Sequence, residues 1–315
     1  MSRAARRLLF VVLWLLLADC FVPPILQRAE HARYEGSVPF RFENSDLFAL
    51  GPMVRYLREH PHGERRRAMF LGNSIVFGYG IPARDAVPAQ FEALAGNTRV
   101  FNAAINGQEL GDSYLVGKSV IDSVDTLFVQ LIDREGARPV LGTLIPVDDD
   151  DARRFHVERR SAVETTLRSL LGRVWRLYAV NDRLQAALFG TSTRQYLYLH
   201  KKELLRGRAP EAPGATASNA PPVTLSAAHN GSGPLPRTLL DLAAVAKARR
   251  KRLVVLDFQS KGNAAAVADF NTAYAPYAEI VTIVVPDALE YDRMHFTAAG
   301  AHAVAAALVA HEAAR

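Results

Sequence analysis

Five short apolar runs, separated by stretches of helical character, constrain the fold of this chain more than any other feature. They lack the strict alternation of apolar and polar residues that marks a strand with one wet face, so each predicts a strand buried on both faces of a parallel sheet. Helical patterns, such as residues 109–123, lie between them. This alternation predicts an α/β domain with a doubly wound, five-stranded parallel sheet. The runs are AMFLG, RVFNAA, TLFVQLI, LVVLDF and IVTIVV, beginning at positions 68, 99, 126, 253 and 280.

The first 26 residues are expected to form a membrane-targeting segment. Apolar residues run almost unbroken from Leu8 to Leu17 and continue more weakly to Leu26, after arginines at positions 3, 6 and 7. The stretch is long enough for a secretory signal peptide and marginal for the roughly 20 residues that cross a bilayer. Because positive charges stay in the cytoplasm, we expect an inner-membrane anchor with the following domain on the periplasmic side. A cleaved signal peptide and a secreted product are the alternative.

Cys20 is the only cysteine of the chain, which excludes an intramolecular disulfide. It ends an LADC motif that vaguely resembles a lipoprotein cleavage box, but Asp19 precedes it where a small residue is normal. That departure argues against lipidation of Cys20.

The net charge of +6 does not predict a nucleic-acid partner. Part of the excess lies in the amino-terminal arginines, and the clusters at residues 65–67 and 249–252 directly precede apolar strands. Cations favour the end of a preceding helix and remain solvated there. No nucleic-acid recognition motif accompanies them.

The apolar runs also divide the chain. Residues 27–67 are expected to form a stalk with one short helix, and residues 68–313 the main domain, with a long insertion at about 134–236. A helical stripe in the insertion is expected to pack onto the main sheet, with a partner or a membrane as alternatives. Residues 208–223 are rich in proline, alanine and glycine, which predicts a flexible loop, and the acidic residues 148–151 predict a solvated turn. The stripe comprises Val163, Leu167, Leu170, Val174, Leu177, Leu184 and Leu188.

A serine and a carboxylate–imidazole pair follow the first and the last apolar runs. Ser74 lies at the turn that follows the first run, AMFLG, and Asp292 and His295 precede a helix that Thr297 is expected to cap. A carboxylate at this spacing can hold one ring nitrogen so that the other faces outward as a base. Parallel strand order brings both strand ends to one edge, where the base can activate the hydroxyl.

Three sequence blocks resemble those of the SGNH (GDSL-like) hydrolase family, over about residues 68–133 and 252–313. The blocks are GNSIVFG, FNAAINGQ and DRMHFTAAG, beginning at positions 72, 101 and 292. The resemblance implies a flavodoxin-like, three-layer α/β/α fold and the hydrolysis or transfer of acyl esters. It further implies that Ser74 is the nucleophile, that His295 and Asp292 complete the triad, and that the N–H groups of Ser74 and Gly107 hold the oxyanion. Asn73 stands where the family usually has aspartate.

The third block departs from the family pattern. Members follow the third strand with a glycine and an asparagine whose amide also holds the oxyanion, whereas this chain has VQLIDREGARP from position 129. Losing one oxyanion donor typically costs about 10²–10³ in turnover. Either Gln130 or Arg134 would replace the missing amide. Loss of catalysis is the alternative interpretation.

The resulting functional hypothesis is a serine esterase that acts on acyl groups of a cell-envelope glycan or a similar O-acylated small molecule. An O-acyltransferase that modifies an exopolysaccharide or cell-wall polymer is one alternative, with an envelope protein as donor partner. A non-catalytic SGNH-fold binding protein is another. We expect no cofactor and no metal. His60 and His62 have a spacing that can bind a metal, but no further ligand accompanies them, which predicts an exposed turn instead.

Overall fold

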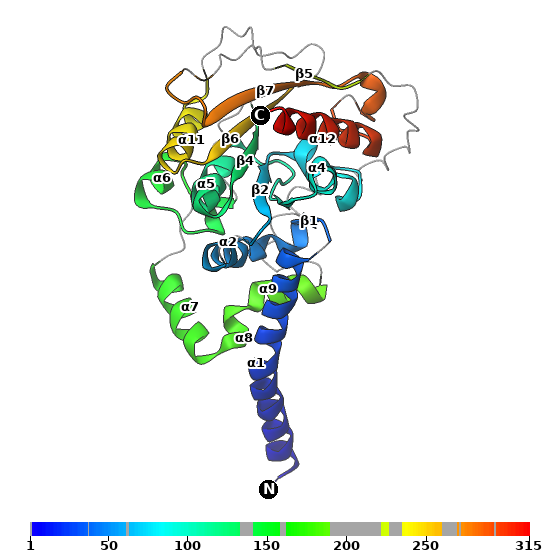
Figure 1. Cartoon of the computed structure of the whole chain (residues 1–315). Helices are drawn as coiled ribbons and strands as arrows, with labels where there is room; N and C mark the ends of the chain where they lie inside the picture. Colours follow the sequence, from blue (N-terminus) through cyan, green and yellow to red (C-terminus); the bar gives the residue numbers. More distant parts are fainter. Residues whose placement is uncertain are drawn as a thin grey trace. The chain divides into compact units, whose positions relative to one another are not determined.

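The computed structural model describes residues 2–36, 38–60, 63–132, 141–157, 162–189, 222–226, 235–259, 270, 272–292 and 294–315. The chain forms two compact units. The helical unit comprises Met1–Ser37, Asn44–Ala49 and Glu158–Leu205. The sheet unit comprises Val38–Glu43, Leu50–Val157 and Arg206–Arg315, and it holds all seven strands described (Figure 1).

The strands form one sheet in the order β1-β3-β2-β4-β6-β7-β5. All neighbouring pairs are parallel except β5 with β7. The predicted apolar runs correspond to β2, β3, β4, β6 and β7, whose spatial order is that of a flavodoxin-like sheet. The predicted α/β class is therefore confirmed. The strands are β1 (Phe40–Arg41), β2 (Arg66–Leu71), β3 (Thr98–Asn102), β4 (Thr126–Gln130), β5 (Thr224–Ser226), β6 (Arg252–Gln259) and β7 (Ala278–Val284).

The prediction of a five-stranded, wholly parallel sheet needs correction. Two short strands extend the sheet, one at each edge, and the antiparallel β5 makes it mixed. β1 and α2 (Leu50–Glu59) come from residues 27–67, and β5 comes from the predicted insertion. Strands of two and three residues are too short to show a periodic pattern in the sequence. They form because the chain pairs there with a neighbouring strand.

Helices cover both faces of the sheet. On one face, α4 (Val87–Ala95) packs against α12 (Ala298–Ala313), and their apolar residues form one core cluster with Ala68 and Phe70 of β2. The intervening Met69 and Leu71 are also buried and point to the opposite face. There α5 (Leu110–Val120) packs against α11 (Arg237–Ala248), which completes three layers (Figure 1).

The acidic residues 148–151 are not the predicted solvated turn. They begin α6 (Asp149–Arg154), and the Asp148 side chain caps this helix by accepting from Asp151 N–H at 2.8 Å. Lys118 donates to the carboxylates of Asp148 and Asp151. The hydrogen bond from Lys118 and the cap contact hold the pKa of Asp148 below its usual value. Residues 208–221 of the predicted loop lie outside the described residues.

The helical unit consists of α1 (Arg3–Glu35), η1 (Asn44–Ala49), α7 (Ala162–Val174), α8 (Arg176–Ala179) and α9 (Asn181–Phe189). By length and composition α1 can cross a membrane: an 18-residue window has a mean hydropathy of 2.3, and none of that window is buried. A signal sequence would have the same properties. Within the helical unit the apolar side chains of α7 are exposed, and the packing of the apolar stripe onto the main sheet stays a prediction.

A buried aromatic cluster links β2, β4 and α4. The rings of Phe70 and Phe128 stack at a centroid distance of 4.3 Å, and Phe91 meets both edge-on. Phe128→Ala is expected to lower the free energy of unfolding by about 3–5 kcal/mol, because the truncation leaves a cavity between these rings. Urea unfolding of the detergent-solubilised chain measures the change. Leu94→Ala, on the exposed side of α4, is the matched control and is expected to shift it by less than about 0.5 kcal/mol. An equal effect of both variants would contradict this account of the core.

Candidate active site

Ser74 lies at the carboxyl end of β2. The chain leaves this strand at Leu71 and turns through Gly72 and Asn73 into α3 (Ser74–Phe77). The Asn73 side chain caps this short helix by accepting from the Ile75 N–H at 3.1 Å. A Cβ on Gly72 would lie 2.6 Å from Gln130 Oε1, so the close approach of this turn to β4 requires glycine. Ser74 therefore occupies the predicted strand-to-helix turn.

The structure brings Ser74, His295 and Asp292 together. Ser74 Oγ lies 2.8 Å from His295 Nε2, and His295 Nδ1 lies 2.7 Å from Asp292 Oδ2. The Asp292 carboxylate also accepts from the backbone N–H groups of His295, at 2.7 Å, and Met294, at 3.1 Å. With Nδ1 donating to the carboxylate, Nε2 is free to accept the serine proton. This is the hydrogen-bonded order that activation of a serine requires.

The environment of Asp292 keeps its carboxylate ionised. Partial burial acts to raise its pKa, but the hydrogen bonds from the His295 ring and backbone, together with the Met294 N–H, outweigh burial and hold the pKa of Asp292 below its usual value. An ionised carboxylate beside His295 Nδ1 favours the tautomer that carries its proton on Nδ1. It also stabilises the imidazolium that forms when Nε2 accepts a proton.

Two tyrosines that the sequence hypothesis did not include flank the His295 ring. The Tyr79 and Tyr291 rings lie at centroid distances of 5.1 Å and 5.7 Å from it. The Tyr291 hydroxyl donates to the Tyr79 carbonyl at 3.0 Å, and burial raises its pKa to about 12, so it remains a donor. Gly80 has a φ of +81°, and a Cβ there would lie 2.5 Å from the Tyr291 hydroxyl. Both tyrosine rings therefore pack near the His295 ring.

Gly107 occupies a tight turn next to the Ser74 loop. Gln108 N–H donates to the Ile105 carbonyl at 3.0 Å, and Gly107 at the third position has a φ of +74°, which favours glycine. Ile105 N–H donates to the Gly72 carbonyl at 3.0 Å and thereby joins the two loops. Among the described residues, no backbone carbonyl accepts from the N–H of Ser74 or Gly107. These two donors are thus available to an anionic ligand.

Gln130 is one of the two predicted replacements for the missing asparagine. Its side chain is buried, and its Oε1 accepts from the Asn73 N–H at 3.0 Å. Gln130 therefore positions the turn that carries Ser74, and only its amide NH₂ can act as a donor. Arg134, the other candidate, lies outside the described residues.

Arg41 and Asn102 support the far end of α3. The Arg41 guanidinium donates to the carbonyls of Phe77, Gly78 and Ile81 at 3.1–3.2 Å and lies 4.4 Å from the Phe77 ring centroid. Asn102 Nδ2 donates to the carbonyl of Phe77 at 3.4 Å and to that of Val76, the residue before it, at 3.3 Å. Sequence reasoning missed both residues, because nothing local distinguishes them from other polar side chains. They satisfy carbonyls that a one-turn helix leaves open.

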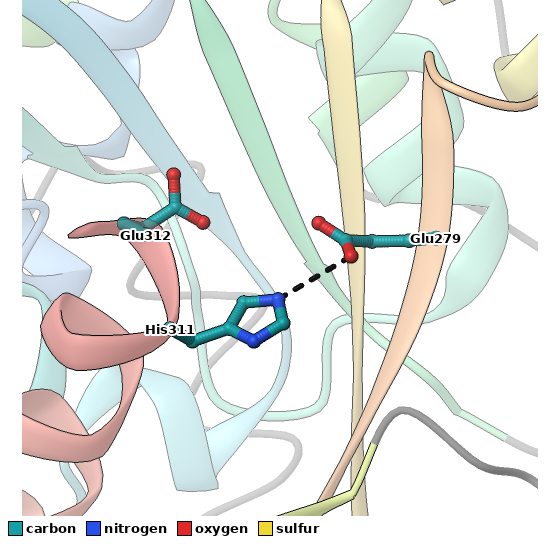
Figure 2. Close-up of side chains that lie close together, drawn as sticks. All are labelled: Glu279, His311 and Glu312. Carbon is teal, nitrogen blue, oxygen red and sulfur yellow. Dashed lines mark hydrogen bonds and ion pairs between the residues drawn. The ribbon is translucent and has the colours of Figure 1, made fainter. Parts of the chain in front are cut away.

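A cluster that resembles a metal site lies elsewhere in the sheet unit. Glu279, His311 and Glu312 offer ligand atoms within 4.8 Å of one another, with Glu279 Oε2 3.3 Å from His311 Nε2 (Figure 2). However, Arg252 pairs with both glutamates, and Arg315 donates to Glu279 at 2.7 Å. Two guanidinium groups already balance the two carboxylates, which favours an ion-pair network over a cation site.

Among the described residues, His60 belongs to no group of three potential metal ligands. His60 Nδ1 lies 3.0 Å from the Tyr56 carbonyl, and its ring stacks on that of Tyr56. His62 lies outside the described residues.

Arg41→Ala is expected to lower the free energy of unfolding by about 2–4 kcal/mol, because three backbone carbonyls lose a charged donor. Urea unfolding of the detergent-solubilised chain measures this. The matched control is Arg84→Ala, since the Arg84 side chain is 78% exposed. A loss no greater than that of the control would show that Arg41 does not support α3.

Comparison with known proteins identifies no family for the chain. No family model and no curated protein matches it. A solved structure titled "Crystal Structure of TesA" is similar at 11% sequence identity, with a TM-score of 0.25. That match covers 67% of this chain and 65% of the other, just under two thirds of its length. Similarity at this level assigns no activity, so the functional inference depends on the geometry around Ser74.

Proposed function

We propose that this chain is a serine esterase of the SGNH type, which hydrolyses ester-linked acyl groups. The observation that supports this most strongly is the hydrogen-bonded series from Ser74 Oγ through His295 to Asp292, with distances of 2.8 Å and 2.7 Å. A serine hydroxyl is a weak nucleophile until a neighbouring base accepts its proton. His295 is positioned for that role, and Asp292 orients its ring.

In the proposed reaction, Ser74 Oγ attacks the ester carbonyl while its proton passes to His295 Nε2. The negative charge that develops on the carbonyl oxygen is held by the N–H groups of Ser74 and Gly107. The tetrahedral intermediate then collapses, and His295 donates its proton to the departing alcohol. Water attacks the acyl-enzyme with His295 again acting as base, which releases the acid and restores Ser74.

We further propose that α1 anchors the chain in the inner membrane, with the sheet unit on the periplasmic side. The arginines at positions 3, 6 and 7 favour a cytoplasmic amino terminus. Contacts within the helical unit favour retention of α1 over cleavage: Glu30 pairs with Arg183, and Arg33 pairs with Asp46. An anchored esterase facing the periplasm would act on O-acylated glycans of the envelope or on similar small molecules.

The same acyl-enzyme also permits acyl transfer. If a sugar hydroxyl rather than water attacks it, the chain is an O-acyltransferase that modifies an envelope polymer. Retention of α1 favours this second candidate, because an anchored enzyme can receive acyl groups from a membrane partner. Incubating the purified chain with p-nitrophenyl acetate and an oligosaccharide separates the two: free acetate identifies hydrolysis, and an acetylated oligosaccharide identifies transfer.

Ser74→Ala is expected to abolish covalent labelling by a fluorophosphonate probe and the release of p-nitrophenol from p-nitrophenyl acetate, because the attacking oxygen is removed. In-gel fluorescence and absorbance measure the two losses. Ser119→Ala is the matched control, since the Ser119 hydroxyl donates to the Leu115 carbonyl within α5. A folded wild-type chain that is neither labelled nor active would favour a non-catalytic binding protein.

Asp292→Asn is expected to lower kcat by about 10³–10⁴-fold with little change in KM, because an amide no longer favours the reactive tautomer of His295. Steady-state kinetics with p-nitrophenyl acetate measure both constants. Asp122→Asn, at an exposed carboxylate paired with Arg249, serves as the control and should keep wild-type kinetics. If Asp292→Asn retained wild-type kcat, the proposed role of Asp292 would be wrong.

A further inference from the structure

Helix α7 carries an exposed apolar stripe. Its side chains recur every three or four residues and therefore lie along one face of the helix. Their exposed fractions range from 41% to 85%, so the described part of the helical unit leaves them uncovered. The α7 stripe consists of Val163, Leu167, Leu170, Leu171 and Val174.

The residues that follow the α7 stripe are those typical of a membrane interface. Trp175 is 42% exposed, and its ring stacks with that of Tyr178 at a centroid distance of 6.3 Å. Arg173 lies two residues before Trp175 and Arg176 directly follows it, and both arginines are exposed. Tryptophan and tyrosine favour the boundary between headgroups and acyl chains, and arginine favours anionic headgroups. The composition therefore fits a helix that lies in the plane of a bilayer surface.

Contacts within the helical unit connect α7 to α1 through α8. Helix α8 follows α7 directly and packs against both α7 and α1 (Figure 1). The Leu177 N–H of α8 donates to Asp19 Oδ1 of α1 at 2.6 Å. Asp19 lies only two residues beyond Leu17, the end of the unbroken apolar run. A carboxylate next to lipid requires a polar partner, and this N–H supplies one.

The exposed residues of α1 indicate what surrounds this contact. Its apolar side chains are exposed on all sides of the helix from Leu8 to Leu17, and again at Phe21 and Ile25. An apolar helix exposed all round is suited to lipid rather than to one protein partner, which would cover a single face. Helix α8, which directly follows the α7 stripe, therefore meets α1 between positions that are suited to lipid.

We propose that α7 and α8 form a second membrane contact, with the α7 stripe lying in the outer surface of the bilayer that α1 crosses. This inference rests on the proposed anchoring by α1 and extends it. The α7 stripe enters the acyl-chain boundary, Trp175 and Tyr178 lie at headgroup level, and Arg173 and Arg176 meet anionic headgroups. The chain is then held to the membrane by two separate segments.

The two tryptophans of the chain allow each segment to be tested in the full-length protein, because Trp14 lies on α1 and Trp175 follows α7. Trp14→Phe leaves Trp175 as the only tryptophan, and Trp175→Phe leaves Trp14. Each variant is reconstituted into vesicles of phosphatidylcholine and phosphatidylglycerol, with or without bromine on the acyl chains. Bromine quenches tryptophan on contact. The expected result is a loss of emission from both Trp14 and Trp175 in the brominated vesicles.

The outcomes separate this inference from the anchoring on which it rests. Quenching of Trp14 without quenching of Trp175 overturns the second contact and leaves the anchor standing, which would favour a protein partner for the α7 stripe. Quenching of neither overturns both.

A second pair of variants tests the α7 stripe itself. In the Trp14→Phe background, Leu170→Asp with Val174→Asp is expected to reduce the quenching of Trp175, because charged side chains oppose insertion. Both positions are exposed, so the fold should tolerate them, and circular dichroism verifies this. Leu94→Asp, at a similarly exposed leucine of α4, is the matched control and should leave quenching unchanged. Undiminished quenching in the double variant would overturn the role of the α7 stripe.

Discussion

The strands from β3 to β7 in the sheet order all run in the same direction, and this constraint brings the ends of β2 and β7 to one edge. Ser74 directly follows β2, and Asp292 and His295 follow β7 after the short η5 (Asp287–Leu289). Ser74 and His295 are 221 positions apart in the chain, so no local interaction can join them. Their hydrogen bond is a consequence of strand direction and strand order. The chemistry that we propose depends on this topology.

Side chains from neighbouring strands hold Ser74 in place. Helix α3 is only four residues long, and an isolated helix shorter than about 12 residues is marginal in water. Gln130, at the end of β4, holds the turn before Ser74, while Asn102 of β3 and Arg41 of β1 hold the carbonyls at the other end of the helix. Because these partners come from the same sheet edge, they hold the backbone on both sides of Ser74. Such preorganisation is what an oxyanion site requires.

The helical unit exposes many of its apolar side chains, whereas the sheet unit buries most of its own. The sheet unit buries most of its leucine, valine and phenylalanine side chains between layers, whereas α1 and α7 leave theirs exposed. Exposed apolar surface of this extent is unfavourable in water and normally marks a contact with lipid or with another protein. Polar contacts such as Glu30 with Arg183 nevertheless join the helices to one another. The unit is therefore suited to a boundary between water and an apolar phase.

The sequence by itself determined the α/β class, five strands of the sheet, the apolar amino-terminal helix and the residues that meet at the sheet edge. These features rest on local periodicity or on short spacings; Thr297, for example, caps α12 as predicted, with its Oγ1 accepting from Gly300 N–H at 3.1 Å. Only the tertiary structure decided the edge strands β1 and β5, the support of α3 by Arg41 and Asn102, the two tyrosines around His295 and the exposure of the α7 stripe. Each of these features depends on residues far away in the chain. The local amino-acid pattern around a residue does not specify which distant group it will contact.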